Sequence, residues 1–166
     1  MAGAVLATAV SVFVFLAYGT TASVARRVGA GDLRGALASG VDGMWLAAGL
    51  GVVVAVATWA TSGLLVDALG VSPAARPFAL DYLHWSLPGL PGMLVVLAAT
   101  GVLRGLQDTV TPLVVAATGA VVNTALNLLL VHGAGLGVAG SAAGTALTQL
   151  GMAVWLAVVV VRGVRR

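Results

Sequence analysis

The stretch that decides the fold is Arg104-Gly-Leu-Gln-Asp-Thr-Val-Thr-Pro112, a short polar segment between two long apolar runs. The run before it covers residues 82–103, and the run after it covers residues 113–131. Each is close to the ~20 apolar residues that an α-helix needs to cross a bilayer. A polar connection this short between runs this long predicts two membrane-spanning helices joined by a tight turn.

The composition of the whole chain also indicates a membrane protein. Hydrophobic residues make up 60% and charged residues 8%, and the mean hydropathy is +1.10. An ordinary soluble domain has about 25% charged residues, so this chain could not cover a globule with polar surface. It contains no cysteine, which excludes disulfides and thiolate metal sites. Its net charge of +3 comes from arginines that flank apolar runs, so we expect the lipid bilayer as partner and no nucleic acid.

Apolar runs of spanning length occur five times along the chain. They cover residues 3–24, 43–66, 82–103, 113–131 and 138–161. Helices satisfy all of their backbone hydrogen bonds internally, as a lipid environment requires. We therefore expect an all-α integral membrane protein with five transmembrane helices, in which Asp42 lies at the edge of the second one.

The arginines predict the orientation of these helices. Three places are arginine-rich: after the first run (Arg26, Arg27, Arg34), after the third (Arg104) and after the fifth (Arg162, Arg165, Arg166). With five spans, all three lie on one side, which the positive-inside bias makes cytoplasmic. We expect a multi-pass protein of the plasma membrane with its N-terminus outside and its C-terminus in the cytoplasm. An outside N-terminus directly before a span suggests a missing preceding helix, and the first run lacks the basic start and short core of a signal peptide.

One glycine motif resembles a nucleotide-binding fingerprint without its context. Gly135-Leu-Gly-Val-Ala-Gly140 fits G-x-G-x-x-G, but a helix-length run precedes it and no acidic residue follows it. We interpret these glycines as an outer turn. Gly140 and Gly144 then form a small-residue face that allows a neighbouring helix to approach closely.

Two prolines fall inside the third run. Pro88 and Pro91 remove backbone donors and are expected to bend or break the helix. Interrupted helices in transporters often mark a moving or substrate-lining segment. A static kink that neighbouring helices repair is an equally good interpretation.

Polar residues inside the last two runs are the candidates for a site. Asn123 and Asn127 lie four residues apart on one helix face, and Thr145 lies at a similar depth in the next run. Gln149 continues the polar face of that run inward. These groups could form interhelical hydrogen bonds, a common role that the chemistry alone favours, or they could line a polar cavity. We name Asn123, Asn127, Thr145 and Gln149 as candidates for a substrate or ion pocket.

The remaining chemistry argues against an enzyme. No nucleophile–base pair or cluster of metal ligands is visible, so we expect no catalytic residues, no metal site and no cofactor. His84 and His132 stand near span ends without a partner cluster, which is typical of interfacial residues rather than metal ligands.

Several segments in order resemble a known transporter family. The stretch from Phe15 to Asp32 resembles the second helix and following loop of multidrug and toxic compound extrusion (MATE) transporters, particularly the DinF-like branch. Arg104–Pro112 resembles the loop between that family's helices four and five. The stretches 123–127 and 135–149 resemble its helices five and six. The chain would then supply helices two to six of a six-helix amino-terminal lobe.

The resemblance implies a function. Members of this family expel drugs, cationic or amphipathic, in exchange for protons or sodium ions by alternating access. In DinF-like members an aspartate on helix one joins polar residues on helices five and six in an ion site. Asn123, Asn127 and Thr145 match the latter positions. Some relatives carry an aspartate where this chain has Asn127, and the first helix and second lobe are missing partners.

Two alternatives remain at this stage. A lipid-linked oligosaccharide flippase of the same superfamily would have similar helices, but its cavity is usually more cationic and this chain has no basic residue mid-span. A non-transporting membrane scaffold subunit would bind a partner through its small-residue faces. The sequence chooses neither the substrate nor the coupling ion.

Overall fold

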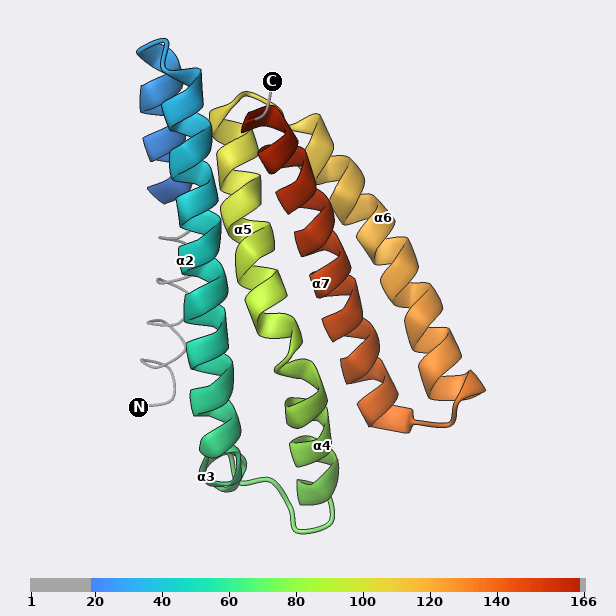
Figure 1. Ribbon diagram of the computed structural model, residues 1–166. Helices are drawn as coiled ribbons and strands as arrows, with labels where there is room; N and C mark the ends of the chain where they lie inside the picture. The colour runs from blue at the N-terminus through green and yellow to red at the C-terminus, as the bar shows by residue number, and fades with distance from the viewer. Residues whose placement is uncertain (1–18, 165–166) are drawn as a thin grey trace.

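The computed structural model describes residues 19–164, which form helices joined by short turns (Figure 1). Residues 19–29 are helical; the rest of the first predicted span, 3–24, lies outside the described residues. The other elements are α2 (Leu33–Ala60), α3 (Ser62–Ala68), α4 (Arg76–Ser86), α5 (Gly89–Gly105), α6 (Val110–Asn127), the π-helix η1 (Leu128–Gly133) and α7 (Gly137–Val164).

Three of these segments are long and apolar enough to cross a membrane. They are Leu33–Ala60, Val110–Gly133 and Gly137–Gly163. The pair α4 and α5 is bent by 48° and makes a fourth if it is one broken span. The expectation of an all-α integral membrane protein is therefore confirmed for the described part of the chain.

The second span differs from its prediction at both ends. The helix α2 begins at Leu33, ahead of residue 43, because the Asp32 carboxylate accepts a hydrogen bond from the Gly35 N–H at 2.8 Å and caps it. It ends at Ala60, and α3 follows as a separate short helix. Asp42 consequently lies inside α2 with an exposed side chain, not at a helix edge. Hydropathy reports the lipid-embedded part of a helix, whereas capping decides where the helix begins.

The bundle is assembled around α5 and α7. In Figure 1, α2, α5, α7 and α6 lie side by side, with α7 between α5 and α6. The largest fully buried side chains come mostly from α5 and α7, among them Leu94, Val102, Leu156 and Val160. Where backbones approach most closely there is glycine: a Cβ on Gly51 of α2 would lie 2.5 Å from the Pro91 Cα. Small residues at such crossings are how helices pack in lipid.

The arginine-rich segments meet at one end of the bundle. The end of α5 lies against the helix over residues 19–29, since a Cβ on Gly105 would be 2.9 Å from the Val24 side chain. The end of α7 lies beside the start of α2, since a Cβ added to Gly163 would lie 3.5 Å from the Leu37 side chain. At the opposite end, Arg76 pairs with Asp67, and its hydrogen bond lowers the pKa of that carboxyl. The segments that carry the arginines therefore lie at the same end of the bundle, as the positive-inside argument requires.

Two glycines of α2 provide a test of this packing. Gly51→Ala places a methyl group against the Pro91 backbone and should destabilise the bundle by roughly 1–3 kcal/mol, because a backbone cannot move aside cheaply. Gly49→Ala, two residues away, meets nothing within 4 Å and should leave stability unchanged or slightly raised. Reversible unfolding of the chain in mixed micelles measures both, and equal effects would contradict the packing described.

Candidate functional site: a polar chain beside the α6–α7 groove

The predicted polar residues form a directed chain of hydrogen bonds. Thr145 donates its hydroxyl to the Ser141 carbonyl at 3.0 Å, so it accepts from the Asn123 amide at 3.3 Å. The Asn123 carbonyl oxygen in turn accepts from the Asn127 amide at 3.1 Å. Each donor is used in the same direction, from α6 toward α7. The structure therefore brings three of the four predicted site residues into one network.

This direction leaves one acceptor at the head of the chain. The Oδ1 atom of Asn127 is buried and has no hydrogen-bond partner among the described residues. It faces Gly144, where an added Cβ would lie 2.7 Å away. A buried oxygen without a donor costs about 1–3 kcal/mol, so this position favours an added donor or cation. The sequence predicts Asn127 as a site residue. Its unpaired oxygen, however, follows only from the direction of the hydrogen bonds between Asn127, Asn123 and Thr145.

The backbone changes its geometry directly after Asn127. The segment Leu128–Gly133 is a π-helix, and Ala134 then donates to the Leu129 carbonyl at 2.8 Å. Single π-turns inside α-helices are frequent at functional sites because they redirect side chains. No residue pattern predicts this turn, and the predicted span over residues 113–131 treats its first four residues as ordinary α-helix.

Three predicted residues line a groove between α6 and α7. Asn123, Thr145 and Gln149 share a hollow of about 290 Å³ with small side chains of α6 and with Met152. Gln149 makes no side-chain hydrogen bond within the described residues and is free to contact a ligand. Asn127 does not line this groove but supports it through Asn123. No carboxylate lines it.

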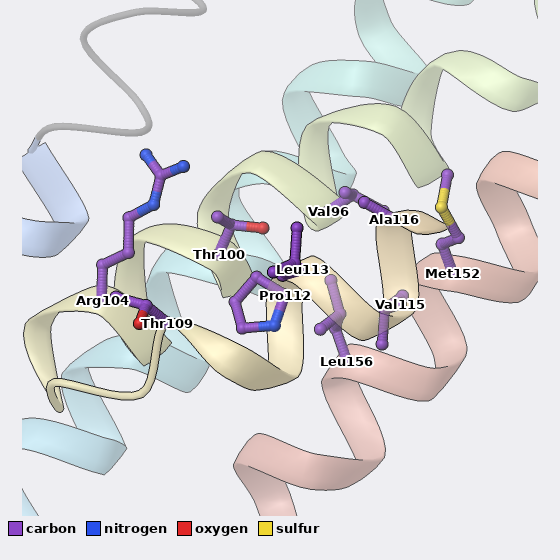
Figure 2. Close-up of a pocket in the computed structure, with 10 residues that line it drawn as sticks. All are labelled: Val96, Thr100, Arg104, Thr109, Pro112, Leu113, Val115, Ala116, Met152 and Leu156. Atoms are coloured by element: carbon purple, nitrogen blue, oxygen red, sulfur yellow. The ribbon is translucent and has the colours of Figure 1, made fainter. Parts of the chain in front are cut away.

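A second cavity continues the groove toward the arginine-rich end. It has a volume of about 450 Å³ and lies between α5, α6 and α7 (Figure 2). Ala116 and Met152 line both hollows, so the two are adjoining parts of one depression. Its walls are mainly apolar, with Thr100, Arg104 and Thr109 as the polar exceptions. Residue patterns did not predict this cavity. Arg104, Thr109 and Pro112 belong to the polar connection between α5 and α6, but the other lining residues come from the interiors of three separate helices.

The predicted bend at Pro88 and Pro91 is present. The helix α4 ends at Ser86, α5 begins at Gly89, and the two are inclined by 48°. Pro91 falls in the first turn of α5, where its missing N–H has no helical partner to lose.

Comparison with known proteins identifies the class to which this bundle belongs. The MatE family profile matches residues 1–129. The chain is 33% identical over 162 residues to the probable multidrug resistance protein NorM of Pseudomonas putida, covering 93% of this chain and 34% of that protein. Among solved structures, an outward-facing multidrug resistance MATE family transporter superposes with a TM-score of 0.81 at 26% identity, over 89% of this chain and 33% of the other. An inward-facing one gives 0.79 at 27% identity, over 86% and 32%.

The chain belongs to the MatE family and is a multi-pass membrane protein. The relatives are described as a probable multidrug resistance protein and multidrug resistance transporters, which agrees with the expectation of a transport protein rather than an enzyme. The chain spans about a third of the length of these relatives. The assignment to the DinF-like branch stays a prediction.

The contact between Gly144 and Asn127 can be tested by a double-mutant cycle. Gly144→Ala should displace the Asn127 side chain, weaken its bond to Asn123 and cost about 1 kcal/mol of unfolding free energy. The same change made in an Asn127→Ala background should cost clearly less, because the obstructing oxygen is gone. Gly151→Ala, which meets open space on the same helix, is the control. Equal costs in both backgrounds would show that Gly144 does not accommodate Asn127.

Proposed function

We propose that this chain is part of an efflux transporter that exports drugs, cationic or amphipathic, across the plasma membrane by antiport with protons or sodium ions. The chain would supply helices two to six of the amino-terminal lobe and would act together with a first helix and a second lobe. The observation that carries the proposal is the polar chain from Asn127 to Thr145, set beside a groove in a MatE-family helix bundle.

The open acceptor of Asn127 supports a coupling role for this cluster. Amide and hydroxyl oxygens suit a sodium ion or a protonated partner group, but none of them titrates near neutral pH. The charge change that proton coupling needs would therefore come from an acid on the first helix of the lobe, as the family resemblance implies. That acid would face Asn123, Asn127 and Thr145.

Rocking of whole lobes is the movement we propose. The chain matches structures described as inward-facing and outward-facing with nearly equal TM-scores, 0.79 and 0.81. This supports a unit whose internal arrangement differs little between the two states, with the bend at Pro88 and Pro91 as the place where adjustment would occur. Under the positive-inside bias, the arginine-rich end faces the cytoplasm.

Loss of the central amide in the full-length protein tests the proposal. Asn123→Ala should reduce drug efflux, measured as ethidium export from cells, by roughly threefold or more, since it removes two hydrogen bonds at ~0.6 kcal/mol each and a groove contact. Thr124→Ala is the matched control, because its hydroxyl bonds only to the Ala120 carbonyl of the same helix. Efflux and ion dependence unchanged by Asn123→Ala would refute the pocket assignment.

A further inference from the structure

The cavity in Figure 2 combines an apolar body with a single charged group at one end. Arg104 lies at one end, and Met152 lies toward the other end, where the adjoining groove begins. Between them stand apolar side chains of α5, α6 and α7, including Val96, Val115 and Leu156. Such a division into charged and apolar parts matches an amphiphile whose head and tail are separated.

The guanidinium of Arg104 has no ion-pair partner among the described residues. The described residues include all five acidic side chains, and none lies at ion-pair distance from this guanidinium. The two carboxylates at this end are occupied elsewhere. Asp32 caps α2 and approaches Arg27. Asp108, just before α6, accepts hydrogen bonds from the Val110 and Thr111 N–H groups and from the Thr111 hydroxyl. Arg104 therefore offers an unpaired positive charge.

The depth of the cavity suits a lipid. Arg104 stands in the last turn of α5, and Thr109 precedes the first turn of α6, so the polar end lies where the arginine-rich segments meet. The apolar end reaches into the bundle. Leu113, on the wall of the cavity, is 69% exposed, which leaves its flank available to acyl chains. Basic pockets between helices at the cytoplasmic side of membrane proteins commonly bind anionic headgroups.

We propose that this cavity is a binding site for an anionic phospholipid, with the phosphate beside Arg104 and an acyl chain along Val96, Val115 and Leu156. The hydroxyls of Thr100 and Thr109 are the additional donors available to the headgroup. This site adjoins the Asn123–Thr145 groove, with which it shares Ala116 and Met152, but the residues proposed to hold the lipid are not the pocket candidates, and lipid binding there does not depend on transport.

Native mass spectrometry of the purified 166-residue chain tests the site, with phosphatidylglycerol and phosphatidylcholine of the same acyl chains added in turn. The unaltered chain should retain more phosphatidylglycerol than phosphatidylcholine. Arg104→Gln should lower that retention about fivefold, the effect of one arginine near a membrane surface. Arg162→Gln removes a charge from the same end but outside the cavity and should change retention little.

A second variant separates the cavity from the charge. Ala116→Leu fills the apolar part and should lower retention of both lipids, with helicity by circular dichroism unchanged. Unaltered phosphatidylglycerol retention in Arg104→Gln would overturn the proposal. So would equal losses in Arg104→Gln and Arg162→Gln, which would indicate diffuse charge attraction, or full retention in Ala116→Leu, which would place the lipid outside the cavity.

Discussion

Close backbone contact at glycine is the constraint on which the rest of this bundle depends. Lipid offers no hydrophobic gain when two apolar helices meet, so they must gain from van der Waals contact at short range. Gly51 against Pro91 and Gly89 against Ala146 bring α5 close to α2 and α7. The same principle extends to the site, where Gly144 leaves room for the Asn127 carbonyl. Glycine at helix crossings therefore serves both the packing of the helices and the placement of the polar side chains.

The position of α7 links these contacts to function. Because α7 packs between α5 and α6 (Figure 1), the groove between α6 and α7 adjoins the cavity that α5, α6 and α7 line together. The groove is lined by amides and hydroxyls, and the cavity ends at an arginine. The bend between α4 and α5 lies against α2 at Gly51, so a change in the angle of the bend would also change the packing of α2.

Sequence reasoning anticipated what depends on local pattern. Apolar length predicted the spans, the prolines predicted the bend, and helical spacing placed Asn123 and Asn127 near Thr145. It failed where the outcome depends on capping or on three-dimensional direction. The Asp32 cap extended α2 past Asp42. The unpaired oxygen of Asn127 results from the direction of its hydrogen bonds. The cavity beside Arg104 results from how α5, α6 and α7 pack in three dimensions. Neither feature can be predicted from the spacing of residues along the sequence.

The central claim is that the α6–α7 groove is a water-filled part of a transport path rather than a lipid-facing surface. The absence of native cysteine allows a direct measurement in this segment: single cysteines along α6, each tested with a membrane-impermeant thiol reagent in the full-length protein. We expect rapid labelling at Ala120, which lines the groove but not the cavity beside Arg104, and slow labelling at Thr118 and Val122 on the other face of α6. Uniform protection of all three positions, or faster labelling at Thr118 and Val122, would contradict it.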